Sequence, residues 1–187
     1  MKKLFFLLAL TVFNLKVLSA QRFYSKDTHV NFNATSPNSP EKIEGANPKG
    51  VCVIDATTGA IELAVLIKSF HFEKALMEEH FNENYMETDK FPKSTFAGSI
   101  TDIKNVNLKK DGSYDVNVSG KLTIHGITKD VNTKAVINVT NGGLSLAKAS
   151  FGVNLSDYGI TIPGAVKDKV STDAKIEIST TLAIYKK

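Results

Sequence analysis

Cysteine, arginine and tryptophan are scarce or missing in this sequence of 187 residues. Tryptophan does not occur, and Arg22 and Cys52 are the single members of their types. One cysteine cannot form an internal disulfide, and its position between Val51 and Val53 favours a buried, unreactive thiol. One arginine argues against a site that recognises phosphate or carboxylate groups through paired guanidinium contacts. The fold must therefore be stabilised by packing rather than by disulfides.

Long apolar runs are also missing, except near the start of the chain. Lys2 and Lys3 precede an apolar run, Leu4–Phe13, which is shorter than the roughly 20 residues that a membrane-spanning helix needs. This pattern is typical of a secretory signal peptide. We therefore expect residues 1–20 to be removed and residues 21–187 to be exported as one domain, either to the periplasm or out of the cell.

No strong excess of charge of either sign remains after that removal. The full chain has 23 basic and 19 acidic residues, and Lys2, Lys3 and Lys16 leave with the signal peptide. The remaining 20 basic and 19 acidic residues give a net charge of +1. Because nucleic-acid binding needs a concentrated basic surface, we expect no nucleic-acid partner.

Apolar and polar residues alternate over much of the chain, which is the pattern of antiparallel strands with one dry face and one wet face. The clearest alternation covers residues 28–34, 60–68, 114–124 and 176–184, with Ile184 on the dry face of the last strand. Glycine-containing turn signals separate the strands at residues 57–60, 109–114 and 140–144. Many short strands and turns predict an all-β barrel or sandwich.

One segment has helical rather than strand periodicity. In residues 72–85, Phe72, Leu76 and His80 recur every four positions, with Met77 and Phe81 beside them, which predicts a short amphipathic helix. Proline cannot continue a helix, so we expect this one to end before Pro92.

The histidines do not form a pattern that predicts a metal site or a catalytic group. Glu78, Glu79 and His80 are adjacent, so on a helix they point in different directions and favour a solvated acidic face. In "GKLTIHGITKDV", residues 120–131, we expect one strand with His125 facing outward and a kink at Gly126. Nucleophile and phosphate-loop motifs are also missing, so we expect no catalytic residue, no metal, no cofactor and no enzymatic activity.

The dry faces of the strands define the interior of the predicted barrel. The residues that we place there are Phe32, Leu63, Val65, Phe96, Val116, Ile124, Phe151 and Ile178. Such a lining suits a hydrocarbon chain better than a polar metabolite. The same side chains could equally fill the barrel and leave no space, and periodicity does not distinguish a ligand-binding interior from a filled one.

Several ordered motifs resemble the YceI-like family of exported bacterial proteins, which bind polyisoprenoid and related lipids. "GKLTIHGITKDV" is similar to the family pattern G-x-L-T-[IL]-x-G-[VI]-T-K-x-V. Residues 23–32, 77–99, 149–160 and 166–178 resemble the opening strand, the helix with its following strand, the S-D-[FY]-G-I turn and the closing strand. Met77 and Leu155 stand where arginine is common, so the resemblance does not extend to a cationic head-group site.

The resemblance implies a lipocalin-like antiparallel barrel of eight strands with one short helix and a lipid tunnel inside it. We add Phe72 and Leu76, from the helical segment, to the residues expected to line the tunnel. The implied function is a periplasmic carrier or storage protein for an isoprenoid or fatty-acyl lipid. Transient contact with a membrane and a monomeric or homodimeric state are compatible with this function. The alternatives are a filled barrel that serves as a structural or interaction domain and, less favoured, an enzyme.

Overall fold

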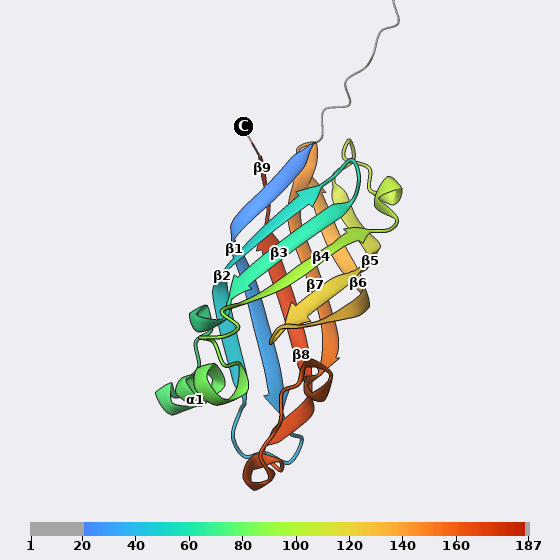
Figure 1. Ribbon diagram of the computed structural model, residues 1–187. Coiled ribbons are helices and arrows are strands. Elements are labelled where there is room, and N and C mark those ends of the chain that lie inside the picture. The colour runs from blue at the N-terminus through green and yellow to red at the C-terminus, as the bar shows by residue number, and fades with distance from the viewer. Residues whose placement is uncertain (1–20, 186–187) are drawn as a thin grey trace, which may run out of the picture.

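Eight antiparallel strands form a closed barrel in the computed structural model, which describes residues 21–185 (Figure 1). The strands are β1 (Arg22–Thr35), β2 (Glu44–Asp55), β3 (Ala60–Leu66), β4 (Lys93–Ile100), β5 (Gly112–Ile124), β6 (Ile127–Thr140), β7 (Gly143–Asn154) and β8 (Val170–Thr181). Each strand pairs with the next, and β1 pairs with both β2 and β8, which closes the barrel. The predicted fold class is therefore confirmed, whereas the predicted signal peptide lies outside the described residues.

The short strand β9 (Ala183–Ile184) follows β8 and pairs with the first residues of β1. The chain leaves the alternation of β8 at Leu182, which is buried. Ile184 is consequently 52% exposed, and its predicted position on the dry face is wrong.

The helical segments are short and lie between the strands. They are η1 (Ile67–Ser69), α1 (Ala75–His80), η2 (Phe81–Tyr85), η3 (Ile103–Asn105), η4 (Leu155–Tyr158) and η5 (Gly164–Val166). The predicted helix corresponds to α1 and η2, and it begins three residues late because His71 forms an antiparallel bridge with Ala46 and keeps the chain extended there. Within residues 21–185, no helix has the length and apolarity needed to cross a membrane.

The barrel has two unlike halves. We call the half with β9 and the β6–β7 turn the closed half, because neighbouring strands from β2 to β8 pair there and β9 pairs with the first residues of β1. We call the other half the open half. There, the last pair between β2 and β3 is Val51 with Ala64, and the part of β2 before Val51 has no partner on β3. Likewise β6 and β7 stop pairing below Ala135 and Ala149. In this half β2, β1, β8 and β7 remain paired side by side, the β5–β6 hairpin is separated from β7, and Figure 1 shows α1 at this end of the barrel.

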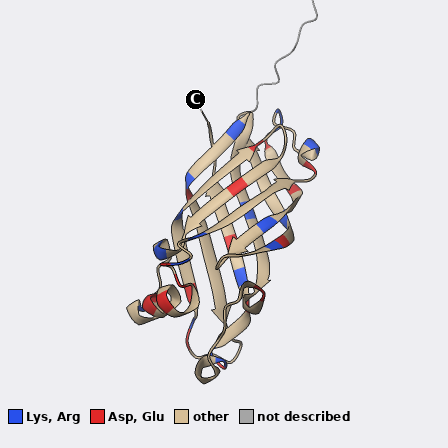
Figure 2. Ribbon diagram, in the orientation of Figure 1, with Lys and Arg blue, Asp and Glu red and all other residues tan. Residues whose placement is uncertain are grey.

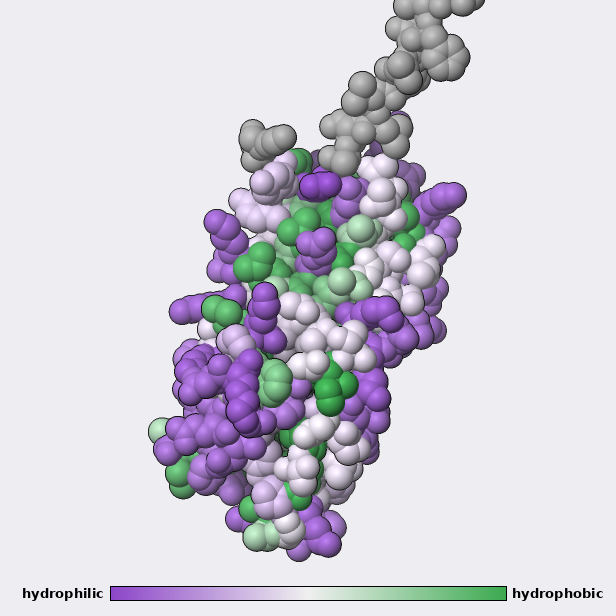
Figure 3. All heavy atoms as spheres, in the orientation of Figure 1, coloured by the Kyte–Doolittle hydropathy of each residue, from purple (hydrophilic) through white to green (hydrophobic). Residues whose placement is uncertain are grey.

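Two clusters of buried side chains correspond to these halves. The closed half is packed with Phe23, Ile54, Ile100, Val116, Ile137, Val139, Leu144 and Leu182, among others. The open half contains Val30, Val65, Ile67, Phe70, Met86, Leu122, Val153, Tyr158 and Ile160, with partly buried phenylalanines packed against them. Apolar side chains are exposed among polar ones on the outer surface (Figure 3). Val51 on β2 and Leu66 on β3 are among the exposed apolar residues.

Two hairpins turn through pairs of residues with positive φ. Asn141 and Gly142 join β6 to β7 with φ of 52° and 79°, as the turn signal predicts. His125 and Gly126 join β5 to β6 with φ of 49° and 75°. The predicted continuous strand with a kink is therefore wrong, because the chain reverses there. Positive φ at both central residues is the rule for such two-residue turns, and histidine at the first of them gave no turn signal.

The predicted turn at residues 109–114 is only partly correct. These residues belong to a longer connection that contains η3 and ends where β5 begins at Gly112. The side chain of Tyr114 donates to the carbonyl oxygen of Lys110 at 2.8 Å, which closes the connection locally.

Candidate ligand-binding cavity

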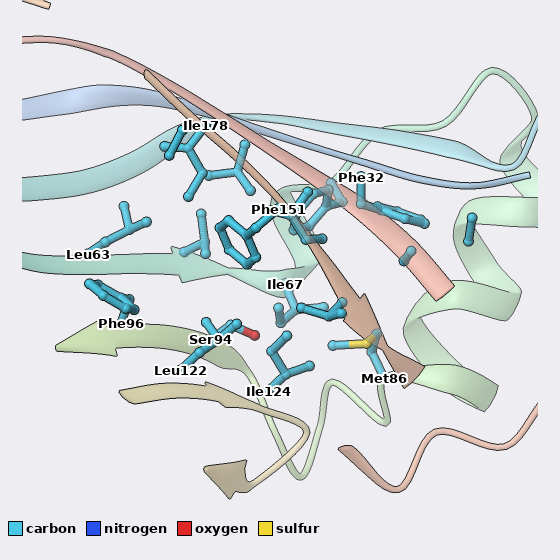
Figure 4. A pocket seen from close by; sticks show the side chains of 18 of the residues that line it. Phe32, Leu63, Ile67, Met86, Ser94, Phe96, Leu122, Ile124, Phe151 and Ile178 are labelled. Atoms are coloured by element: carbon cyan, nitrogen blue, oxygen red, sulfur yellow. The ribbon is translucent and has the colours of Figure 1, made fainter. Parts of the chain in front are cut away.

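An apolar cavity of about 480 Å³ lies inside the barrel. Its walls come from strands that are distant in sequence, and Figure 4 shows their side chains pointing toward one another across the space. The volume lies within the range of about 300–1,000 Å³ that is typical of pockets for small ligands. The cavity extends from the open half into the closed half, where Ile54, Ile100 and Ile137 line it. Phe23, Val139 and Leu144 of the closed half do not line it.

Nine of the ten predicted lining residues are at the cavity wall. They are Phe32, Leu63, Val65, Phe72, Leu76, Phe96, Ile124, Phe151 and Ile178. The strand residues among them occupy the alternate positions whose side chains point into the barrel. Leu76 comes from α1 at the end of the barrel. Their part in binding a lipid remains a prediction.

Val116 is the predicted residue that does not line the cavity. It is 2% exposed and belongs to the cluster that fills the closed half. Alternation along β5 correctly predicts that Val116 faces inward. It cannot indicate that the space opposite Val116 is filled, because this depends on side chains from other strands.

Sequence reasoning missed a group of phenylalanines at the open half. Phe70 and Phe81 line the cavity together with Phe32 and Phe72. The rings of Phe32 and Phe81 are stacked with centroids 5.3 Å apart, and Phe70 packs edge-on against Phe32 at 5.8 Å. Such ring pairs stabilise by about 0.5–1.5 kcal/mol beyond the area that they bury. The signal was present in the sequence, since Phe81 falls on the apolar face of the predicted helix.

Few polar groups reach the inner wall. Ser94 on β4 is 7% exposed and brings a hydroxyl group among apolar side chains (Figure 4). Thr180 also lines the wall, and its hydroxyl is hydrogen-bonded to that of Thr28 at 2.8 Å. The walls are therefore made of hydrocarbon, with isolated hydroxyl groups rather than a converging polar set.

Cys52 lies at the cavity wall and is 4% exposed. Burial raises the pKa of its thiol to about 12. The thiolate is the reactive form of cysteine, so the thiol is unreactive at neutral pH, as its apolar sequence context predicts.

Charged side chains occur at the end of the cavity that faces α1. The lining there includes Glu41, Lys74 and Lys169, together with His80 and the exposed side chain of Leu76. Lys74 forms an ion pair with Glu41, and the ammonium group of Lys169 lies 3.8 Å from the other oxygen of the same carboxylate. This combination of exposed and lining residues marks the entrance of the cavity.

His125 joins three segments of the open half. Its Nε2 atom lies 3.0 Å from Oε2 of Glu87, and its Nδ1 atom lies 3.2 Å from the carbonyl oxygen of Tyr158. Its ring packs edge-on against Phe91 with centroids 4.5 Å apart. The side chain is 12% exposed, so it does not face outward to solvent as predicted. It holds the β5–β6 turn against the chain that follows η2 and against η4.

Figure 2 shows acidic residues on α1, and its Glu78 and Glu79 line a second groove rather than the cavity. Glu78 accepts a hydrogen bond from the backbone N–H of Phe72 at 3.2 Å, whereas Glu79 is exposed. Within residues 21–185, no group of three or more histidine, cysteine or acidic side chains is arranged to hold a metal ion.

Comparison with known proteins identifies relatives of this chain. A family model described as the YceI-like domain matches residues 22–182. A UPF0312 protein of Pseudomonas putida is 29% identical over 99 residues, which are 50% of this chain and 48% of the relative. A UPF0312 protein of Pseudomonas fluorescens is 29% identical over 126 residues, 64% of this chain and 62% of the relative. The match thus spans about half the length of the first of these curated relatives.

Solved structures with the same fold have low sequence identity to this chain. A polyisoprenoid binding domain from Saccharophagus degradans is 12% identical, with a TM-score of 0.73 over 89% of this chain and 99% of that domain. BcnA of Burkholderia cenocepacia is 18% identical, with a TM-score of 0.64 over 83% of this chain and 96% of BcnA. The family match covers almost all of the barrel, from the start of β1 to the end of β8. With its fold and motifs in agreement, this chain belongs to the YceI-like family.

Proposed function

We propose that this protein binds one long apolar chain, of an isoprenoid or fatty-acyl lipid, inside the barrel and acts as an exported carrier or storage protein. The single observation that carries the proposal is the cavity of about 480 Å³ with walls of hydrocarbon. The structural neighbour from Saccharophagus degradans is described as a polyisoprenoid binding domain, which supports this class of ligand.

The transfer of hydrocarbon from water into the cavity would supply the affinity. Each buried CH₂ group contributes about 0.8 kcal/mol, so ten of them contribute about 8 kcal/mol. Association costs an estimated 4–15 kcal/mol in lost freedom, and a preformed cavity lowers the part of this cost that comes from ordering the protein. A chain of ten to twenty carbons therefore suffices for binding without a specific polar contact.

The two alternative functions have less support. A filled barrel that serves only as an interaction domain would have no cavity of this size in its interior. An enzyme needs polar groups that converge on a reacting atom, and Ser94 and Thr180 are isolated hydroxyls in an apolar wall. Binding without catalysis is therefore the function that we propose.

Native mass spectrometry of the purified protein, followed by solvent extraction, tests the proposal directly. We expect a co-purifying lipid of fixed mass that is released by the solvent. A protein that carries no lipid and takes up neither a fatty acid nor a prenyl alcohol would contradict the proposal.

Substitutions of the cavity wall test where the lipid binds. Val65→Trp and Ile124→Trp place large side chains at lining positions and should reduce lipid uptake at least tenfold. Leu66→Trp is the matched control, because Leu66 is 60% exposed on the same strand as Val65 and does not line the cavity. Circular dichroism should show the same fold for all three variants. Uptake that survives both wall substitutions would place the ligand elsewhere.

Export is the second part of the proposal and rests on the sequence of residues 1–20. Fractionation of cells that express the full chain should recover the protein outside the cytoplasm. The intact mass should correspond to a chain that begins near Gln21. A cytoplasmic protein that retains residues 1–20 would contradict export but not lipid binding.

A further inference from the structure

We propose that the ligand carries an anionic head group, a carboxylate or a phosphate, which binds at the cavity entrance between Lys74 and Lys169. This inference rests on the proposed function and adds to it the chemical class of the lipid. It concerns the entrance alone, and the apolar walls do not depend on it.

The fold brings three charged residues to the entrance from distant parts of the chain. Glu41 lies in the connection between β1 and β2, Lys74 immediately precedes α1, and Lys169 immediately precedes β8. The backbone holds these segments in place, because Ser36 donates to the carbonyl oxygen of Lys169 at 2.9 Å and Ala34 donates to that of Ile43 at 2.9 Å. The cluster therefore exists only in the folded barrel.

The charges at the entrance favour an anion. Among residues 21–185, Glu41 is the single acidic residue that lines the cavity, whereas Lys74 and Lys169 both line it beside Glu41. One carboxylate thus faces two ammonium groups, which leaves a net charge of +1. Lys74 is hydrogen-bonded to Glu41, but the 3.8 Å between Lys169 and Glu41 exceeds hydrogen-bond length. The ammonium group of Lys169 therefore retains donors for another anionic oxygen.

The acidic residues near the entrance face another surface. Glu73, Glu78, Glu79 and Glu83 line a separate groove on the outer side of α1 and η2. The helical segment thus presents its carboxylates away from the cavity. Glu73 acts on Lys74 through its charge but lines this groove rather than the cavity, so a head group inside the entrance would meet the two lysines and Glu41 first.

The surroundings of the lysines match an amphiphile rather than a free anion. Ile43, Phe72 and Leu76 also line the cavity and come from the same connections and helix as Glu41 and Lys74. A lipid whose tail lies in the cavity would therefore place its head beside the ammonium groups.

Matched amphiphiles that differ only in the head group test the inference. The delipidated protein is titrated with sodium hexadecanoate, hexadecyl phosphate and 1-hexadecanol, each by displacement of the neutral fluorophore N-phenyl-1-naphthylamine. Half-exposed ion pairs are worth up to about 1 kcal/mol each, so two lysines should give the anions a roughly five- to tenfold advantage over the alcohol at low salt. Salt of about 1 M should reduce this advantage, because it shortens the Debye length to about 3 Å.

Three variants separate the charge effect from the shape of the entrance. Lys74→Gln with Lys169→Gln should abolish the preference for the anions and leave the affinity for 1-hexadecanol unchanged. Glu41→Gln should raise the affinity for hexadecanoate, because it removes the competing carboxylate. Lys167→Gln is the control, since Lys167 is exposed nearby and does not line the cavity.

The outcomes distinguish this inference from the proposed function. Preference for either anion, lost in the lysine variant, supports the inference, and the tighter anion identifies the head as carboxylate or phosphate. Equal affinity for all three amphiphiles overturns the inference and leaves lipid binding intact. Failure of every amphiphile and of the fluorophore to bind overturns the proposed function itself.

Discussion

Two side chains with unusual backbone conformations meet in the open half of the barrel. His125 and Glu87 have φ of 49° and 42°, a region that residues other than glycine seldom occupy. Their side chains contact each other at 3.0 Å. Lys90, and after it His125, lowers the pKa of Glu87, so the carboxylate is ionised at neutral pH. The contacts of His125 compensate for backbone conformations that are unfavourable by themselves.

We predict that His125→Asn destabilises the protein by about 0.5–1.5 kcal/mol, which is the net contribution of a typical intramolecular hydrogen bond. Asparagine adopts the positive φ of this turn readily, so the backbone conformation is preserved and only the ring contacts are lost. Urea denaturation should show a lower midpoint with an unchanged slope.

A double-mutant cycle with Glu87→Gln attributes the loss to the pair. The two substitutions together should cost less than the sum of the two alone, because each removes the same contact. Additive effects would mean that the backbone turn, rather than the contact, determines the effect of His125→Asn.

At the scale of single residues, the sequence predicted which way a side chain points better than it predicted which residues that side chain contacts. The inward phase of Val65 and Ile124 follows from alternation, and the structure has both at the cavity wall. The partners of His125 come from positions 87 and 158, and no local pattern relates these residues to position 125. The outward orientation expected for His125 failed because the turn redirects its side chain toward those segments.

At the scale of elements, α1 and η2 are attached to the barrel mainly through one aromatic group. Phe81 packs against Phe32, Phe70 and Phe72, with centroid distances of 4.9–5.8 Å within the group. Leu76, one turn earlier, is 61% exposed. Phe81 therefore attaches the segment to the barrel, whereas Leu76 lies at the entrance.

We predict that Phe81→Ala lowers the free energy of unfolding by about 1–3 kcal/mol, less than the 3–5 kcal/mol of a fully buried phenylalanine because Phe81 is only partly buried. Leu76→Ala should change stability by less than about 0.5 kcal/mol, as surface substitutions usually do. Thermal or urea unfolding of both variants provides the comparison. Equal losses for the two would show that the helix is attached through more than the aromatic group.

The strands themselves were largely predictable, whereas their unpaired ends were not. Period-two alternation in residues 60–68 and 114–124 predicts β3 and β5. The separation of β6 from β7 below Ala135 and Ala149 has no counterpart in the alternation, which continues on both strands. In the open half η4 lies against β6, β7 and β8, and this arrangement depends on the whole chain rather than on the local pattern.

At the scale of the whole molecule, the cavity is the difference between the volume that the barrel encloses and the volume of the side chains that point into it. The wall residues are as apolar as those of the closed half, so composition and periodicity could not distinguish a cavity from a core. The distinction depends on where β3 stops pairing with β2 and where β6 separates from β7. A resemblance to a lipid-binding family supplied the expectation of a tunnel, and the geometry supplies its extent.

We predict that removal of the lipid lowers the thermal stability of the whole protein. A ligand present at 100 times its Kd stabilises the folded state by about 2.7 kcal/mol. For a chain of this size, each kcal/mol shifts Tm by about 2–4 °C, so delipidation should lower Tm by about 5–10 °C. Differential scanning calorimetry before extraction, after extraction and after lipid is restored measures the shift. The Tm of the Val65→Trp variant should not change when lipid is restored. A wild-type Tm that is the same with and without lipid would contradict this prediction.

The packed closed half also determines by which end of the barrel a ligand could enter and leave the cavity. Phe23, Val139 and Leu144 are each at most 2% exposed and seal that end, so the cavity is a dead end rather than a passage. A lipid that enters tail first would have to leave head first through the same entrance. Donor and acceptor membranes would therefore have to meet the same end of the barrel, one after the other.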